Sequence, residues 1–218
     1  MLFLDQRTTI GFTQWLGEGL LVSDGARWSR SRRLLTPAFH FDILRPYVNV
    51  NNECAELMLN QISKYADSGK PFELYKVVSA CTLDIILKCA FSYETDCQKD
   101  GESHPYITAV RDIAHGVAER SRKFWLHPDI IYYLTPTGRK FKRLCDYVHG
   151  VAEDVIEKRQ KVLDKEGAPQ RKYLDFLDIL LTAKDENGIG LTRHNSKWNF
   201  LDSVLLSRTS RISGKGSS

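Results

Sequence analysis

Several patterns that would assign this sequence to a common class of protein are missing from it. No run of about 18 apolar residues occurs, so we expect no membrane span, and the opening MLFLDQRTTIGF is too short and too polar for a signal peptide. No segment repeats with a period of about 20 to 50 residues, which excludes solenoids and propellers. The patterns G-x-S-x-G, G-x-G-x-x-G and G-x-x-x-x-G-K followed by Ser or Thr are also absent. Serine-hydrolase, dinucleotide-binding and phosphate-loop sites therefore lack their starting residues.

The cysteines offer no closed set of disulfides, because there are five of them and none forms a C-x-x-C pair. A reducing compartment is the simpler inference. Most of these residues fall at apolar positions of helical patterns, where a free thiol behaves as a small apolar side chain. We therefore predict buried free thiols. They are Cys54, Cys81, Cys89, Cys97 and Cys145.

Charge gives little indication of a partner, because 31 basic residues are nearly balanced by 27 acidic ones. One short segment is an exception, with Arg27, Arg30, Arg32 and Arg33 close together. Such a cluster could follow nucleic-acid phosphates. Since the rest of the chain is nearly neutral and contains no recognised nucleic-acid-binding motif, we predict no nucleic-acid partner. We expect a soluble chain that is cytoplasmic or peripheral to a membrane.

The spacing of apolar residues predicts a mainly α protein with little strand. An N-cap at Ser23 or Asp24 begins a helix of about three turns, which Pro37 ends. Residues 71–74, PFEL, are predicted to form a brief strand. Residues 124–134 are apolar and aromatic, and their proline excludes one uninterrupted helix, so we predict a partly buried connection. Further helices are predicted over residues 47–65, 78–89, 104–123, 135–166 and 173–181.

Trp28 and Arg32 are the best candidates for a binding pair. They are four residues apart, so on a helix they lie on one face. Together they offer an indole N–H and a guanidinium group, which donate hydrogen bonds and accept none, and such a pair suits a carboxylate. The alternative is a tryptophan packed in the core beside an exposed arginine.

The segment WLGEGLLVSDGARWSRSRRLLTPAFHFDILRPY, residues 15–47, resembles the helix C region of the cytochrome P450 superfamily and, within it, family 4, the fatty-acid ω-hydroxylases. In that family a Trp-x-x-x-Arg on helix C faces the haem, and its basic side chain pairs with a haem propionate. The resemblance implies this role for Trp28 and Arg32, and haem as the cofactor. It continues, over residues 15–192, through CTLDIILKCAFSYETDCQ (helix E), DIIYYLTPTGRKFKRLCDYVHGVAEDVIEKRQKVL (helices F to G) and YLDFLDILLTAKDENGIGLT (helix H).

The resemblance also implies a function for the parent enzyme. It would be a haem-thiolate monooxygenase that hydroxylates a fatty acid or similar lipid with electrons from a reductase, at the endoplasmic reticulum membrane. The loop before helix C and the connection at residues 124–134 would wall the substrate channel. The connection would also touch the membrane.

The sequence departs from the family after Thr192, where Arg193-His194-Asn195-Ser196 replaces the acidic start of helix I. The (A/G)-G-x-(D/E)-T segment of helix I and the Phe-x-x-Gly-x-Arg-x-Cys loop that binds iron are absent. We therefore expect a partial P450 domain over residues 15–192, a divergent and disordered tail over residues 193–218, and no iron ligand. The chain alone is expected to be inactive. The alternative is a non-enzymatic truncated isoform that acts as an interaction module, because helices C to H would leave apolar faces unpaired.

Three further groupings look like functional motifs, but we interpret them otherwise. His115 with Glu119, and His149 with Glu153, stand four residues apart. Metal sites need three or four converging ligands, so surface ion pairs or solvated side chains are favoured. Residues 119–122 match the Glu-x-x-Arg of helix K but occur far too early in the chain, and we interpret them as a solvated helix face.

Overall fold

The computed structural model is mainly helical, as the apolar spacing predicts. Within the described ranges no strand occurs, and one isolated antiparallel bridge joins Lys184 to Gly190. In the same ranges no helix is long and apolar enough to cross a bilayer. The described residues are 13–17, 19–69, 71–93, 97–100, 104–166, 176–185, 188–191 and 196–202.

The predicted helix before Pro37 is confirmed as α2, Gly25–Leu35, with Asp24 at its N-cap. The proline then opens a 3-10 turn, η1 (Thr36–Phe39), because its fixed φ suits the first turn of a helix but its ring cannot continue the preceding one. A short helix, α3 (Phe41–Leu44), follows η1.

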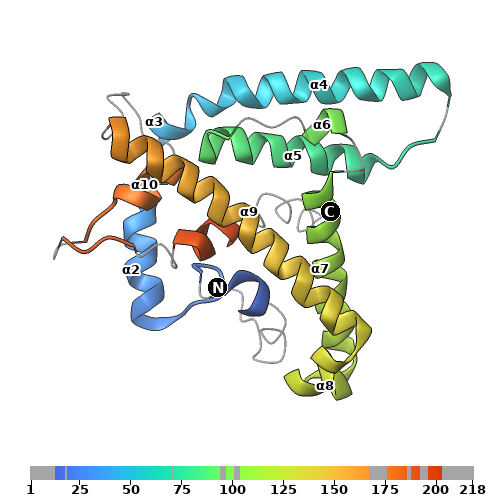
Figure 1. Ribbon diagram of the computed structural model, residues 1–218. Helices are drawn as coiled ribbons and strands as arrows, with labels where there is room; N and C mark the ends of the chain where they lie inside the picture. Colours follow the sequence, from blue (N-terminus) through green and yellow to red (C-terminus); the bar gives the residue numbers. More distant parts are fainter. Residues whose placement is uncertain are drawn as a thin grey trace, which may run out of the picture.

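Two long antiparallel helices form the next layer, α4 (Tyr47–Ser68) and α5 (Leu74–Phe91), which run side by side in Figure 1. Gly69 ends α4 in a left-handed conformation with φ of 63°. The predicted strand at residues 71–74 is wrong, since Phe72 and Glu73 have no strand partner and α5 begins at Leu74.

The apolar stripe predicted for residues 47–65 is present on α4, but it is not a core face. Cys54 is the buried member, whereas Leu57 and Tyr65 stay exposed. The reason is geometric, because α4 lies at the edge of the described fold and packs mainly on α5. Periodicity gives the face of a helix but not what covers it.

The buried carboxylate of Asp84 on α5 holds the short helix α6 (Cys97–Asp100). It accepts hydrogen bonds from the backbone N–H of Cys97, at 2.9 Å, and of Gln98, at 3.1 Å. Buried ionic groups need such partners. These hydrogen bonds therefore fix α6 against α5.

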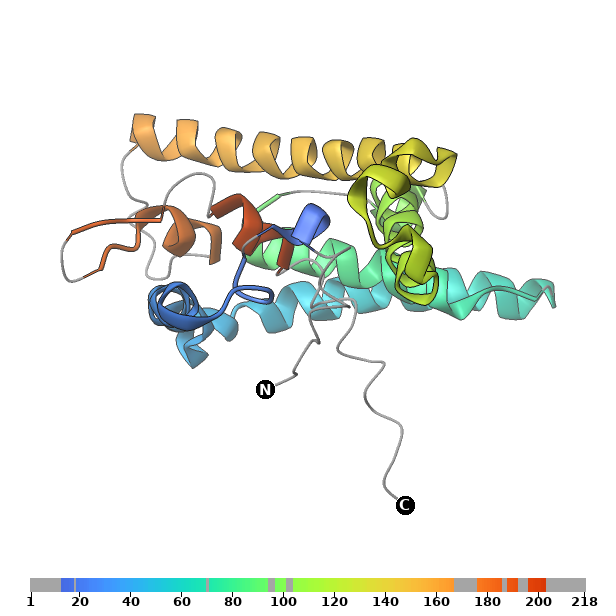
Figure 2. The same ribbon diagram turned by 90° about the horizontal axis from the view of Figure 1, so that it is seen from below.

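The helix α9 (Pro136–Glu166) has 31 residues and runs across one face of the molecule (Figures 1 and 2). It packs on α7 (Pro105–Arg122), on α8 (Asp129–Leu134) and on α10 (Phe176–Thr182). A bidentate ion pair from Arg159 to the buried Asp178, with both N···O distances at 2.7 Å, joins α9 to α10. Most of the apolar face predicted for α9 is buried, including Phe141, Cys145, Val148, Ala152, Val155 and Ile156, but Val162 is exposed.

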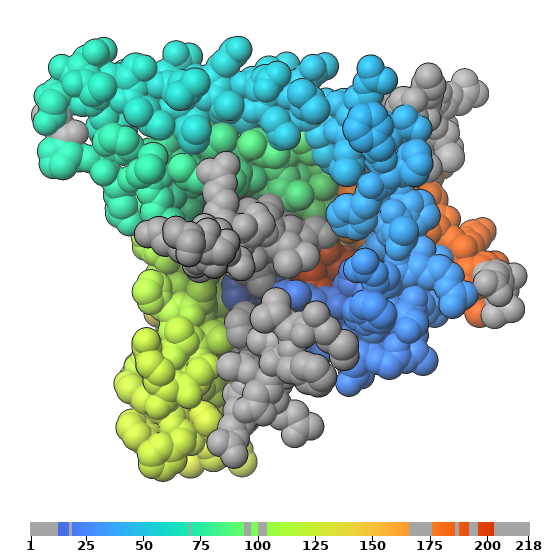
Figure 3. Space-filling model, turned by 180° about the vertical axis from the view of Figure 1, so that it is seen from behind, coloured from blue at the N-terminus to red at the C-terminus, as the bar shows by residue number. Residues whose placement is uncertain are grey.

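The layers are clearest from below (Figure 2), where α9 lies on one side and α2 and α4 on the other. Between them lie α10 and a helical segment over residues 196–202. From behind, α4, α2 and the pair α7 and α8 occupy three sides of the molecule (Figure 3).

Residues 196–202 differ from expectation, because we predicted them to be part of a disordered tail. They are helical and largely buried, and Trp198, Phe200 and Leu201 belong to the hydrophobic core. The remaining tail residues, 193–195 and 203–218, lie outside the described residues, as do Tyr173 and Leu174 of the last predicted helix. The boundary at residue 192 stays a prediction.

Two glycines of α9 give a matched test of the packing. A Cβ at Gly138 would lie 2.0 Å from the Tyr132 carbonyl oxygen, whereas a Cβ at Gly150 would meet nothing within 4 Å. Gly138→Ala should destabilise the chain by about 1–3 kcal/mol through overpacking. Gly150→Ala should stabilise it by about 0.5–1 kcal/mol, because alanine is the better helix former. Urea unfolding of both variants measures the difference, and equal effects would contradict the contact between α8 and α9.

Candidate functional site

Trp28 and Arg32 lie together on α2, as their spacing predicts. The Arg32 guanidinium carbon lies 5.7 Å from the centroid of the Trp28 ring, and both side chains are exposed. The alternative of a core tryptophan is wrong, since Trp28 is 40% exposed. The residues that α2 buries are Ser31, Leu34 and Leu35.

This pair can bind an anion that carries more than one oxygen. The indole N–H and the guanidinium both donate, and in the described part of the chain no carboxylate forms an ion pair with Arg32. Hydrogen bonds between a charged donor and a carboxylate are about twice as strong as neutral ones. A carboxylate placed over this face of α2 would therefore be bound by both side chains.

A neighbouring arginine, Arg30, fixes α2 in place. Its Nε donates to the Asp185 carboxylate at 2.9 Å, and its Nη2 donates to the carbonyls of Ile189, at 2.9 Å, and Gly190, at 3.2 Å. Arg30 is therefore occupied by the turn after α10. This contact leaves fewer arginines of the segment available to nucleic-acid phosphates, which weakens the nucleic-acid hypothesis.

The chain before α2 is held by residues far along the sequence. His149 Nε2 lies 2.8 Å from the Trp15 carbonyl, and its ring meets Trp198 edge to face with centroids 5.0 Å apart. Burial lowers the pKa of His149, so the neutral imidazole is favoured. Our interpretation of His149 and Glu153 as surface ion pairs or solvated side chains is confirmed for Glu153, which pairs with Lys197 at 2.8 Å. It is wrong for His149, which is half-buried against Trp15 and Trp198.

Residues 119–122 were interpreted as a solvated helix face, and for Arg120 this interpretation is wrong. Arg120 is 2% exposed, and its guanidinium donates to the carbonyls of Leu126 and His127 and to the Asp129 carboxylate. It also lies 4.4 Å from the Tyr132 ring centroid. The signal was available in the sequence, since Arg120 continues the buried spacing of Ile113, Gly116 and Val117 on α7.

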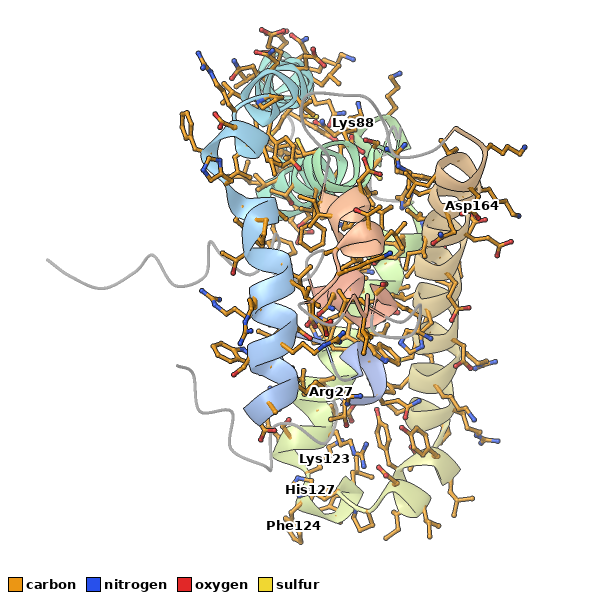
Figure 4. The ribbon with its side chains drawn as sticks, turned by 90° about the vertical axis from the view of Figure 1, so that its left-hand side faces the viewer. Arg27, Lys88, Lys123, Phe124, His127 and Asp164 are labelled. Carbon is orange, nitrogen blue, oxygen red and sulfur yellow. The ribbon has the colours of Figure 1, made fainter. Side chains whose placement is uncertain are left out.

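Arg120 organises a protruding apolar end of the molecule. The connection predicted at residues 124–134 forms a 3-10 turn, η3 (Phe124–Leu126), and α8, with Leu126 and Tyr132 buried. Figure 4 shows Phe124, Lys123 and His127 gathered at this end. We call the exposed apolar set the apolar tip; its members are Phe124, Trp125, Ile130, Ile131 and Leu134.

All five cysteines are buried free thiols, which confirms the prediction. Burial raises the pKa of Cys89 and of Cys145 to about 12, so these two stay protonated near neutral pH. Thiolate is the form that binds metals. In the part of the chain that the structure describes, no group of three or more His, Cys, Asp or Glu side chains could hold a metal ion.

The chain is similar to known proteins of one family. The family model for Cytochrome P450 matches residues 4–204, which extends beyond both predicted domain boundaries. The chain is 41% identical over 182 residues to Cytochrome P450 4F11 of Homo sapiens, covering 80% of this chain and 34% of that protein. A crystal structure of a cytochrome P450, CYP102L1, matches with a TM-score of 0.77 and 19% identity, covering 95% of this chain and 46% of the other.

Two further relatives carry names that describe a reaction. The chain is 43% identical over 182 residues to taurochenodeoxycholic 6 alpha-hydroxylase of Sus scrofa, covering 82% of this chain and 36% of that protein. It is 41% identical over 181 residues to ultra-long-chain fatty acid omega-hydroxylase of Homo sapiens, covering 80% and 34%. The chain thus spans about a third of the length of the curated relatives it matches.

Asp202, in the buried segment 196–202, should make the stability of the chain depend on pH. Burial raises the pKa of its carboxyl to about 7 in the folded chain, compared with ~3.9 when unfolded. The folded state therefore binds the proton more tightly, so the stabilisation is complete below about pH 4 and is lost as pH rises to about 7. Thermal melts should show that Asp202→Asn removes this part of the pH dependence. The exposed Asp164→Asn should not, and an unchanged slope in Asp202→Asn would contradict the assignment.

Proposed function

The chain belongs to the cytochrome P450 family, and from this premise we propose that it is the substrate-side part of a haem-thiolate monooxygenase acting on a fatty acid or similar lipid. The names of two relatives, a fatty acid omega-hydroxylase and a taurochenodeoxycholic 6 alpha-hydroxylase, support a lipid-like substrate. The observation that carries the proposal is the shared exposed face of Trp28 and Arg32. A reductase would supply the electrons to the parent enzyme.

The residues present fit one end of a haem. Its propionates are carboxylates, which accept hydrogen bonds. The side chains of Trp28 and Arg32 only donate hydrogen bonds. Arg32 would form the charge-assisted contact, while the indole N–H of Trp28 would donate a second hydrogen bond. Bound haem with a cysteine thiolate supplies the oxygen-activating chemistry, and the protein supplies binding and orientation.

The thiolate end of the cofactor is not matched by this chain. Its five cysteines are buried, and Cys145 lies on the core face of α9 with a strongly raised pKa. We therefore propose that the chain alone does not carry out the reaction, and that the iron ligand belongs to the remainder of the parent enzyme.

The apolar tip supports the proposed contact with lipid. Phe124 and Ile130 are 75% and 79% exposed, and they lie in one group with three other exposed apolar side chains. Single exposed apolar residues are common, whereas a group of them marks an interaction surface. Arg139, Lys142 and Arg143 line a shallow pocket on the first turns of α9, directly after α8. An apolar surface beside basic side chains suits the boundary between acyl chains and acidic headgroups. We propose that this end touches the endoplasmic reticulum membrane in the parent enzyme and also walls the substrate channel.

The second candidate is a non-enzymatic interaction module. Exposed apolar side chains on α4 favour it, because Val48 and Leu59 on one side of the helix, and Leu57 and Tyr65 on another, are not fully covered by the described residues. Surfaces of this kind promote association. A monodisperse monomer in sedimentation experiments would count against this candidate and would leave the monooxygenase proposal intact.

The haem contact can be tested in the full-length parent enzyme, with the numbering of this chain. Arg32→Gln removes the charged donor, and losing such a hydrogen bond costs about 1.5–3 kcal/mol. Haem transfer from the enzyme to apomyoglobin should therefore be about 10 to 100 times faster. Arg122→Gln, which removes an exposed arginine at the end of α7, is the control and should leave the transfer rate unchanged. Equal rates in the Arg32 variant and the wild type would exclude the proposed contact.

The missing thiolate predicts a spectrum. The 218-residue chain, mixed with reduced haem and carbon monoxide, should fail to give the absorption near ~450 nm that thiolate-bound iron produces. The parent enzyme under the same conditions should give it. A ~450 nm band from this chain would mean that one of its own cysteines ligates iron.

A further inference from the structure

The turn before α2 has two backbone amides that its own carbonyls do not satisfy. Within the turn, the Gly19 carbonyl accepts from the N–H groups of Val22, at 3.3 Å, and Ser23, at 2.9 Å. The N–H groups of Leu20 and Leu21 instead bond to side chains far along the chain. Asn199 Oδ1 accepts from Leu20 at 3.0 Å, and Asp202 Oδ2 accepts from Leu21 at 2.7 Å.

These contacts are part-buried, and the side chains that accept them, Asn199 and Asp202, are each 2% exposed. Losing either acceptor removes a hydrogen bond that contributes about 0.5–1.5 kcal/mol, so the turn would be held less firmly. No donor reaches Asp202 Oδ1 within the described residues, which leaves Oδ2 as the atom that holds the turn.

Close packing requires glycine on the turn side of this contact. Gly17 has φ of +60°, and a Cβ there would lie 2.1 Å from the Trp198 ring. A Cβ at Gly19 would lie 2.2 Å from Asp202 Oδ2. Larger residues at either position would therefore push residues 196–202 away from the turn.

The segment that supplies these side chains is itself fixed to α9. Lys197 pairs with Glu153 at 2.8 Å, and its ammonium lies 4.5 Å from the Trp198 ring centroid. The Trp198 indole also packs edge to face with His149 on α9, with ring centroids 5.0 Å apart. Contacts therefore run without a break from α9 through residues 196–202 to the turn before α2.

We propose that Asn199 and Asp202 are positioning residues, which hold the amides of Leu20 and Leu21 and thereby set where α2 presents Trp28 and Arg32. This role rests on the proposed function, in which that face meets a haem propionate. The α2 helix begins at Gly25, three residues before Trp28, and the Trp28 N–H bonds the Asp24 carbonyl at 3.1 Å. A displaced turn would therefore move Trp28 directly. Arg30 on α2 would stay bonded to Asp185.

The test uses the 218-residue chain with fluorinated tryptophan, so that its four indoles give separate fluorine NMR signals. Substituting each tryptophan in turn by phenylalanine assigns them. Asp202→Ala should shift the Trp28 signal and leave that of Trp125, at the apolar tip, unchanged. Exchange of the Leu21 amide with deuterium should become about tenfold faster, as expected for one lost hydrogen bond.

Conservative replacement separates positioning from general packing. Asp202→Asn keeps an oxygen acceptor of the same shape and should restore both the Trp28 signal and the slow Leu21 exchange. Asp164→Ala, at the far end of α9 from the apolar tip (Figure 4), is the control and should change neither. If Asp202→Ala does not fold, Asn199→Ala should give the same pattern at the Leu20 amide.

Two outcomes would overturn the proposal. One is an unchanged Trp28 signal in an Asp202→Ala chain whose Leu21 amide exchanges rapidly. The other is a uniform shift of all four tryptophan signals, which would indicate a general loss of packing. Because no haem is used, failure here is distinguishable from failure of the haem contact in the parent enzyme.

Discussion

The position of α2 depends on polar contacts with residues about 155 to 181 positions later in the chain. Arg30 reaches Asp185, and the amides before the helix reach Asn199 and Asp202. Each of these groups is at least partly buried, so each needs a partner in the folded state. The exposed face with Trp28 and Arg32 is therefore presented by a helix whose other sides are fixed by side-chain hydrogen bonds as well as by apolar packing.

Local features of this fold could be predicted from the sequence. The 3.6-residue periodicity of α9 gives its buried face, and a four-residue spacing on α2 gives the common face of Trp28 and Arg32. Both features depend on residues within a few turns of one another. The same rules fail where the environment decides, as on α4, where Leu57 and Tyr65 of the predicted apolar stripe stay exposed because α5 covers only part of the helix.

Two predictions were wrong for different reasons. Arg120 was interpreted as part of a charged surface, although its spacing on α7 continues the buried face, and η3 folds back to offer it carbonyls six and seven residues away. Residues 196–202 were predicted to be part of a disordered tail, because nothing nearby in the sequence reveals that Asn199 and Asp202 satisfy amides near the other end of the chain. Long-range pairs of this kind have no local signature, whereas helical periodicity does. The haem role of Trp28 and Arg32 came from family resemblance and stays a proposal.

The most direct measurement of the central claim is a crystal structure of the haem-loaded parent enzyme. The account predicts a guanidinium nitrogen of Arg32 about 2.7–2.9 Å from a propionate oxygen, with the Trp28 indole N–H directed at the same carboxylate group. Propionates held by other residues, with Trp28 and Arg32 both facing solvent, would contradict it.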